Sequence, residues 1–107
     1  MDTEKINKAY DELRIAKSNH YKAAFQYALA RADLENEKAA ALRDGRIDGK
    51  NAELREAVAR ELFPKIYGRL EKLDELQREA RFILDVAQIE VDRLDMIIRY
   101  LTIQESL

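Results

Sequence analysis

The sequence has no cysteine or tryptophan, and its 107 residues include one proline, three glycines and one histidine. Without cysteine the chain forms no disulfide and offers no thiolate for catalysis or metal binding. Ser18 and Ser106 have no base and orienting acid at a spacing that would activate a hydroxyl. The near absence of glycine and proline leaves long stretches without a helix breaker. We therefore expect long helices and no enzyme active site.

Composition points the same way. Charged residues make up 37% of the chain and hydrophobic residues 47%, a profile typical of long helices and coiled coils and too apolar for a disordered tail. The length allows one domain, residues 1–107. The net charge of −2, with both signs mixed, does not favour a nucleic-acid or membrane-surface protein.

Neither a membrane span nor a signal peptide is expected. The most apolar stretch, residues 82–103, contains several charged residues, each costing roughly 2.5–3.5 kcal/mol near a bilayer centre. The first residues, MDTEKINKAYDEL, have no apolar run of the signal-peptide kind. We expect a cytoplasmic protein.

A first helix is predicted over residues 3–43, where apolar residues recur at the 3-and-4 spacing of a coiled-coil seam. One row holds Ile6, Leu13, His20, Tyr27, Leu34 and Ala41; the other holds Ala9, Ala16, Ala23 and Ala30. Alanine along a whole row allows a partner helix to approach closely.

A connector follows. Residues 44–51 (DGRIDGKN) form a predicted turn, with Gly45 ending the first helix. Asn51 is a natural N-cap for a short helix over residues 52–62, which has Leu54, Val58 and Leu62 on one side. Phe63-Pro64 predicts a break or a sharp kink.

A last helix is predicted over residues 64–105, with its own heptad row. If residues 44–63 form a connector between the long helices, these helices have nearly equal lengths. The residue numbers of two positions that face each other across the hairpin then sum to about 107. If instead the chain continued straight from the glycine turn, the sum would be about 95. The first register is favoured because it sets leucine rows against each other, with large residues facing small ones. The fold class is an all-α, coiled-coil-like hairpin of two long antiparallel helices.

The last helix has more apolar surface than one seam needs, so either the short middle helix or a second subunit must cover the rest. We favour a second subunit, and hence a dimeric helical bundle. The residues expected to mediate self-association are Phe82, Val86, Ile89, Met96, Ile97, Tyr100 and Ile103.

No motif indicates a cofactor or a metal. GRIDGKN has three residues between its glycines, an Asn after the lysine and a helix before it, so it is not a nucleotide-binding P-loop. His20 has no second histidine with which to build a bundle metal site. We therefore expect no catalytic, cofactor-binding or metal-binding residues.

The stretch RIDGKNAELREAVARELFPKIY, followed by a heptad helix ending EVDRLDMIIRYL, resembles small uncharacterised helical proteins of bacteria and their phages or prophages. The likeness covers about residues 46–101 and includes the Gly-Lys-Asn-Ala turn at residues 49–52 with Arg55 after it. The resemblance implies a phage-related setting and brings no activity.

These observations predict a non-enzymatic interaction or scaffold protein of phage or prophage type, homodimeric, with an unidentified protein partner. The alternative is an accessory protein of phage-type DNA metabolism with weak nucleic-acid contact near the turn. Its candidate contacts are Arg46, Lys50 and Arg55, although acidic residues are interleaved with them.

Overall fold

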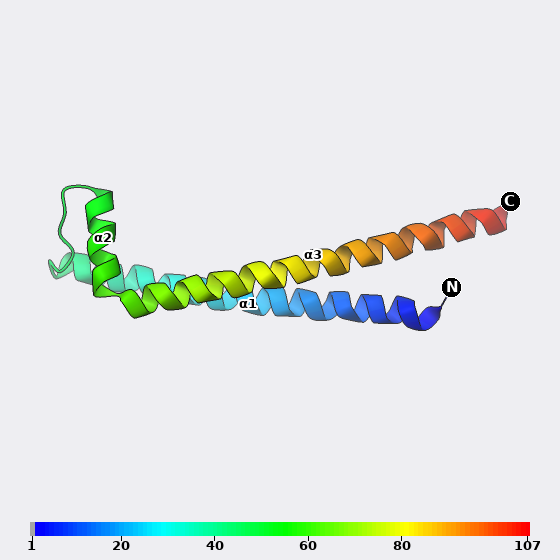
Figure 1. Cartoon of the computed structure of the whole chain (residues 1–107), viewed down its shortest axis with the longest axis horizontal. Helices are drawn as coiled ribbons and strands as arrows, with labels where there is room; N and C mark the ends of the chain where they lie inside the picture. Colours follow the sequence, from blue (N-terminus) through cyan, green and yellow to red (C-terminus); the bar gives the residue numbers. More distant parts are fainter. Residues whose placement is uncertain (1) are drawn as a thin grey trace. The chain divides into compact units, whose positions relative to one another are not determined.

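The computed structural model describes residues 2–107, which form three α-helices and, within that range, no β-strand. Helix α1 spans Thr3–Arg43, α2 spans Ala52–Leu62 and α3 spans Pro64–Ser106. α1 and α3 run in opposite directions and pack against each other, with α2 in the connection between them (Figure 1). The predicted all-α hairpin with a short middle helix is confirmed, and α3 ends one residue beyond its predicted end.

A glycine turn ends α1. Gly45 has a φ of +76°, a conformation that costs little in a residue without a Cβ. The backbone N–H of Arg46 donates to the carbonyl of Ala41 at 2.9 Å. This bond satisfies one of the carbonyls that a helix end leaves without a partner.

α2 begins and ends on local signals. The side-chain oxygen of Asn51 accepts from the backbone N–H of Leu54 at 2.9 Å, which is an N-cap. Phe63 lies outside helical geometry, with φ −124° and ψ 50°, and its N–H donates to the carbonyl of Ala59. Because α3 begins at Pro64, the Phe63-Pro64 step is a break between two helices and not a kink within one.

The contacts divide the chain into two compact units. The terminal unit comprises the residues up to Lys22 together with Arg78–Leu107, and the turn unit comprises Ala23–Gln77. Each unit contains part of α1 and part of α3, and the turn unit also contains α2. A single domain over residues 1–107 stays a prediction.

In the terminal unit, α1 and α3 share one narrow apolar seam. Its buried residues are Ala9 and Leu13 from α1 and Val91 and Leu94 from α3. The Tyr10 hydroxyl donates to the Asp95 carboxylate at 2.6 Å beside it. The positions of Tyr10 and Asp95 sum to 105, which is close to the register of about 107 and far from the one of about 95.

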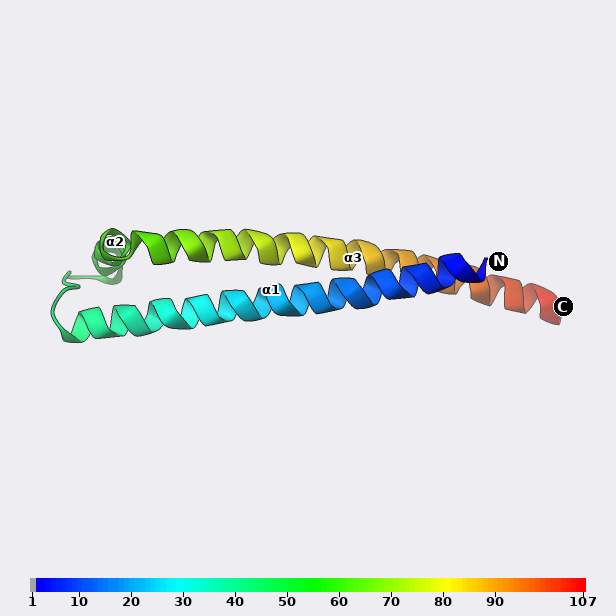
Figure 2. The same cartoon turned by 90° about the horizontal axis from the view of Figure 1, so that it is seen from below.

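In the turn unit, the core gathers residues from α1, the turn and α2: Ala41, Ile47 and Ala59, with Val58, Phe63 and Tyr67 packed against them. α2, which is upright in Figure 1 and seen nearly end-on in Figure 2, stands crosswise to α3 at the N-terminal end of α3. Both alanines are 0% exposed, whereas Leu54 and Leu62 are 49% and 40% exposed. The side of α2 that carries its leucines is therefore not the one that is most deeply buried.

The alanine contacts leave no room for larger side chains. We expect Ala59→Leu to destabilise the protein by about 1–3 kcal/mol, because three added carbons must displace Ala41 or Ile47. Urea denaturation followed by circular dichroism measures the change. The matched control is Ala57→Leu, on the exposed side of the same helix, which should leave stability nearly unchanged. Equal effects of the two variants would contradict tight packing at Ala59.

Candidate interaction surface on helix α3

In the terminal unit, α3 has two apolar rows. The inner seam, which packs against α1, contains Leu84, Ala87, Val91 and Leu94. A second row has the same alternating spacing of four and three residues, and its positions are displaced by two residues from those of the inner seam. We call this row the outer seam; its members are Phe82, Val86, Ile89, Arg93, Met96, Tyr100 and Ile103. Because each residue turns the helix by about 100°, an offset of two places the outer seam roughly opposite the inner one.

The outer seam is exposed in the single chain. Its six uncharged side chains are each between 51% and 72% exposed, with Val86 the least and Met96 the most. Ile97, beside them, is half-buried. All seven residues predicted for self-association thus lie on or next to one stripe of α3; their role in self-association stays a prediction.

The short middle helix lies in the turn unit, whereas this stripe lies in the terminal unit. Ala59, the buried residue of α2, belongs to the core of the turn unit, and the outer-seam side chains remain exposed with α2 present. Cover of this stripe by a second subunit stays a prediction.

An apolar groove adjoins the outer seam. Ile15 of α1 and Ile83 of α3, which are 50% and 51% exposed, face it from the two helices. The groove has a volume of about 660 Å³ and is lined by Glu12, Ile15, Ala16, Asn19, Ile83, Val86, Ala87, Ile89 and Glu90. The sequence analysis missed Ile15 and Ile83. Ile83 follows Phe82 in the sequence, so it lies beside the outer seam on the surface of α3.

Charged groups border the outer seam. Arg93, the one charged member, donates to Glu90 at 2.8 and 3.2 Å, and these bonds lower the pKa of the Glu90 carboxyl. Asp85 pairs with Arg81 at 3.2 Å, and both side chains are exposed. The apolar row is therefore interrupted by one cation and flanked by carboxylates.

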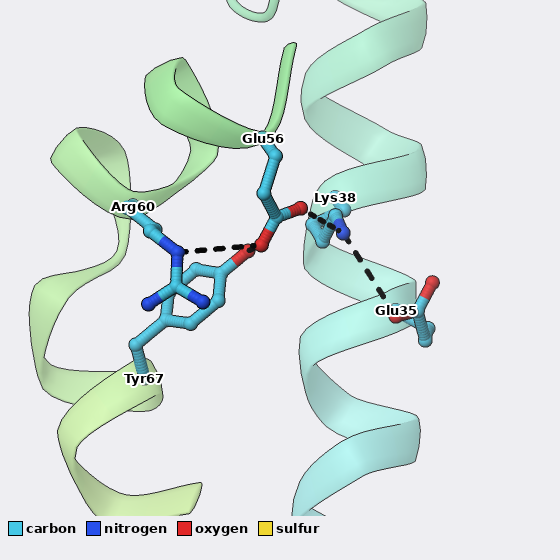
Figure 3. A network of polar contacts seen from close by, with 5 residues as sticks. All are labelled: Glu35, Lys38, Glu56, Arg60 and Tyr67. Carbon is cyan, nitrogen blue, oxygen red and sulfur yellow. Dashed lines mark hydrogen bonds and ion pairs between the residues drawn. The ribbon is translucent and has the colours of Figure 1, made fainter. Parts of the chain in front are cut away.

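A polar cluster in the turn unit joins all three helices (Figure 3). The Lys38 ammonium group of α1 donates to Glu56 of α2 at 2.8 Å, and the Tyr67 hydroxyl of α3 donates to the same carboxylate at 2.7 Å. Glu35 lies 3.9 Å from Lys38, and the Arg60 guanidinium lies 4.7 Å from the centre of the Tyr67 ring. The sequence analysis missed this cluster, because Lys38, Glu56 and Tyr67 come from three different helices and no spacing along the chain relates them.

The same bonds shift the acidities of the cluster. The hydrogen bond from Lys38, followed by the one from Tyr67, lowers the pKa of Glu56. The bond to Glu56 raises the pKa of Lys38, and burial together with that bond raises the pKa of Tyr67. Each charge thus has its partner within the cluster, an arrangement that stabilises the connection between helices.

The three basic residues considered for nucleic acid do not form one free surface. Arg46 pairs with Asp44 at 3.2 Å, and Arg55 is half-buried and donates to the carbonyl of Gly49. Lys50 is exposed. Two of the three cations are thus engaged by acceptors of their own chain.

In residues 2–107, no helix is long and apolar enough to cross a bilayer, and no three His, Cys, Asp or Glu side chains gather as a group of metal ligands. No protein-family model, curated protein or solved structure matches the chain.

The polar cluster gives stability a pH dependence. Because the folded state lowers the pKa of Glu56, its contribution is complete above the ordinary pKa of a glutamate and is lost as the pH falls through the lower folded value. We expect Glu56→Gln to cost about 1 kcal/mol at neutral pH, and the difference from the wild type to shrink in acid. Urea denaturation between pH 7 and pH 3 measures both effects.

The control is Glu61→Gln, at an exposed position of the same helix, which should match the wild type at neutral pH. A cost for Glu56→Gln that stays constant down to pH 3 would contradict the ionic role of the cluster.

Proposed function

We propose that this protein is a non-enzymatic helical interaction protein that forms a homodimer through the outer seam of α3. The observation that carries the proposal is the row of six uncharged side chains, each at least half exposed, opposite the face that α1 covers. A helix that is apolar on two opposite sides is stable in water only when both sides are covered.

Physical chemistry favours a partner for this row. Apolar surface removed from water contributes about 25 cal/mol per Å². The terminal unit buries five hydrophobic side chains, three of which are alanine or valine. A chain of this size therefore gains much of its stability from surface that a second subunit would bury.

A contact role, and not catalysis, is also supported by the polar groups. The most strongly linked polar groups, Lys38, Glu56 and Tyr67, satisfy one another. A catalytic acid or base instead needs an open path to a substrate. The phage or prophage setting, a scaffold role and a further protein partner are proposed on the resemblance over residues 46–101 and on the exposed surface. We do not propose nucleic-acid contact, because Arg46 pairs with Asp44 and Arg55 donates to the carbonyl of Gly49.

Charge placed on the outer seam should prevent dimer formation. We expect Val86→Glu with Ile89→Glu to give a monomer, because two carboxylates per chain would be buried in the interface without partners. Light scattering coupled to size-exclusion chromatography measures the mass, and circular dichroism on the same sample measures helix content.

The matched control is Asn7→Glu with Ser18→Glu, which adds the same charge at exposed positions of α1 and should leave the mass of the wild type unchanged. A wild-type protein that elutes as a monomer, or an outer-seam variant that remains a stable dimer, would refute the proposal.

A further inference from the structure

We infer that the second copy docks antiparallel on the outer seam, in the register that sets Ile89 of one copy opposite Tyr100 of the other. The inference rests on the proposed homodimer and adds its orientation and its register. Both follow from where the charged residues interrupt and flank the row.

The parallel arrangement brings like charges together. In a parallel, in-register pair each seam residue meets its own copy, so Arg93 meets Arg93 in the middle of the interface. Asp85 and Glu90 lie at the flanking positions that face each other across such a pair. The interface would therefore hold a buried pair of cations and two pairs of carboxylates, all repulsive.

The antiparallel arrangement removes these conflicts. With Ile89 opposite Tyr100, Val86 faces Ile103 and Arg93 faces Met96 of the second copy. Arg93 is already held by Glu90 of its own helix at 2.8 Å, so its charge enters the interface with a partner. Its aliphatic stem can then lie along the methionine while the guanidinium stays at the rim.

The flanking charges become complementary in this register. Asp92 of each copy lies beside Arg99 of the other, which gives two ion pairs related by the twofold axis. On the other flank Ile97 lies beside Glu90 of the second copy, whose carboxylate is already paired with Arg93 of its own chain. Shifting the helices by one heptad would instead set Phe82 opposite Tyr100 and bring the two Asp92 side chains together. Charge complementarity thus selects one of the two registers.

The available area suits a second copy. Six side chains, each exposing roughly 100 Å², present on the order of 600 Å². A standard interface buries about 800 Å² on each partner, and the Ile97 flank and the Asp92 pairs add to the seam.

The absence of cysteine allows a direct test by disulfide formation. Ile89→Cys and Tyr100→Cys, one of them carrying an affinity tag, are mixed under reducing conditions and then oxidised. In the antiparallel register position 89 lies within disulfide range of position 100, whereas like positions are about 16 Å apart. We expect the mixed disulfide as the main product and little disulfide from either variant alone. Asp11→Cys, at an exposed position of α1, is the control and should not cross-link.

Other cross-linking results overturn the inference. Self-cross-linking of each single variant without the mixed product would indicate a parallel dimer. Efficient cross-linking of Phe82→Cys with Tyr100→Cys in place of the 89–100 pair would indicate the shifted register. If the wild type scatters as a dimer and no seam cysteine cross-links, the copies meet elsewhere. A monomeric wild type would instead refute the proposed function itself.

A charge exchange tests the flanking ion pair independently. Asp92→Arg and Arg99→Asp should each raise the dimer Kd at least several-fold, because each sets like charges opposite each other. The double variant restores opposite charges and should return to within about twofold of the wild type. Single variants that do not weaken the dimer, or a double variant without recovery, would rule out the Asp92–Arg99 contact.

Discussion

The structure depends on alanines at the contacts between helices, where a small side chain lets two helices approach closely. In the terminal unit Ala9 packs with Val91 and Leu94, and in the turn unit Ala41 packs with Ala59. Among residues 2–107, no large side chain is completely buried. Contacts of this kind give close packing over a narrow strip, and they leave the remaining faces of each helix to other partners.

The two rows of α3 differ in the charged residues that they contain. The inner seam is uniformly apolar and packs against α1, whereas the outer seam is broken by Arg93 and bordered by Asp85, Asp92 and Arg99. An unbroken apolar row would associate in many orientations and registers with similar affinity. A charge within the row and unlike charges beside it reduce that number, because most alternatives bring like charges together.

Local chemistry made the helix boundaries predictable. Gly45, Asn51 and Pro64 each act through their own backbone or their near neighbours, so the sequence was enough to place the turn, the cap and the break. The outer seam was also visible as a spacing. The Lys38–Glu56–Tyr67 cluster was not, because its members come from three helices and meet only after folding. Nor was the burial of Ala59, because the crosswise position of α2 decides which of its sides faces the core.

The distribution of contacts along the chain gives folding a direction. In the turn unit Lys38 and Glu56 are 18 residues apart, whereas in the terminal unit Tyr10 and Asp95 are 85 residues apart. Closing the longer loop first would cost about 1.4 kcal/mol more in chain entropy. We therefore expect the turn unit to form first, after which each further contact between α1 and α3 closes only a short additional loop. The terminal unit, which carries the outer seam, is then expected to form last.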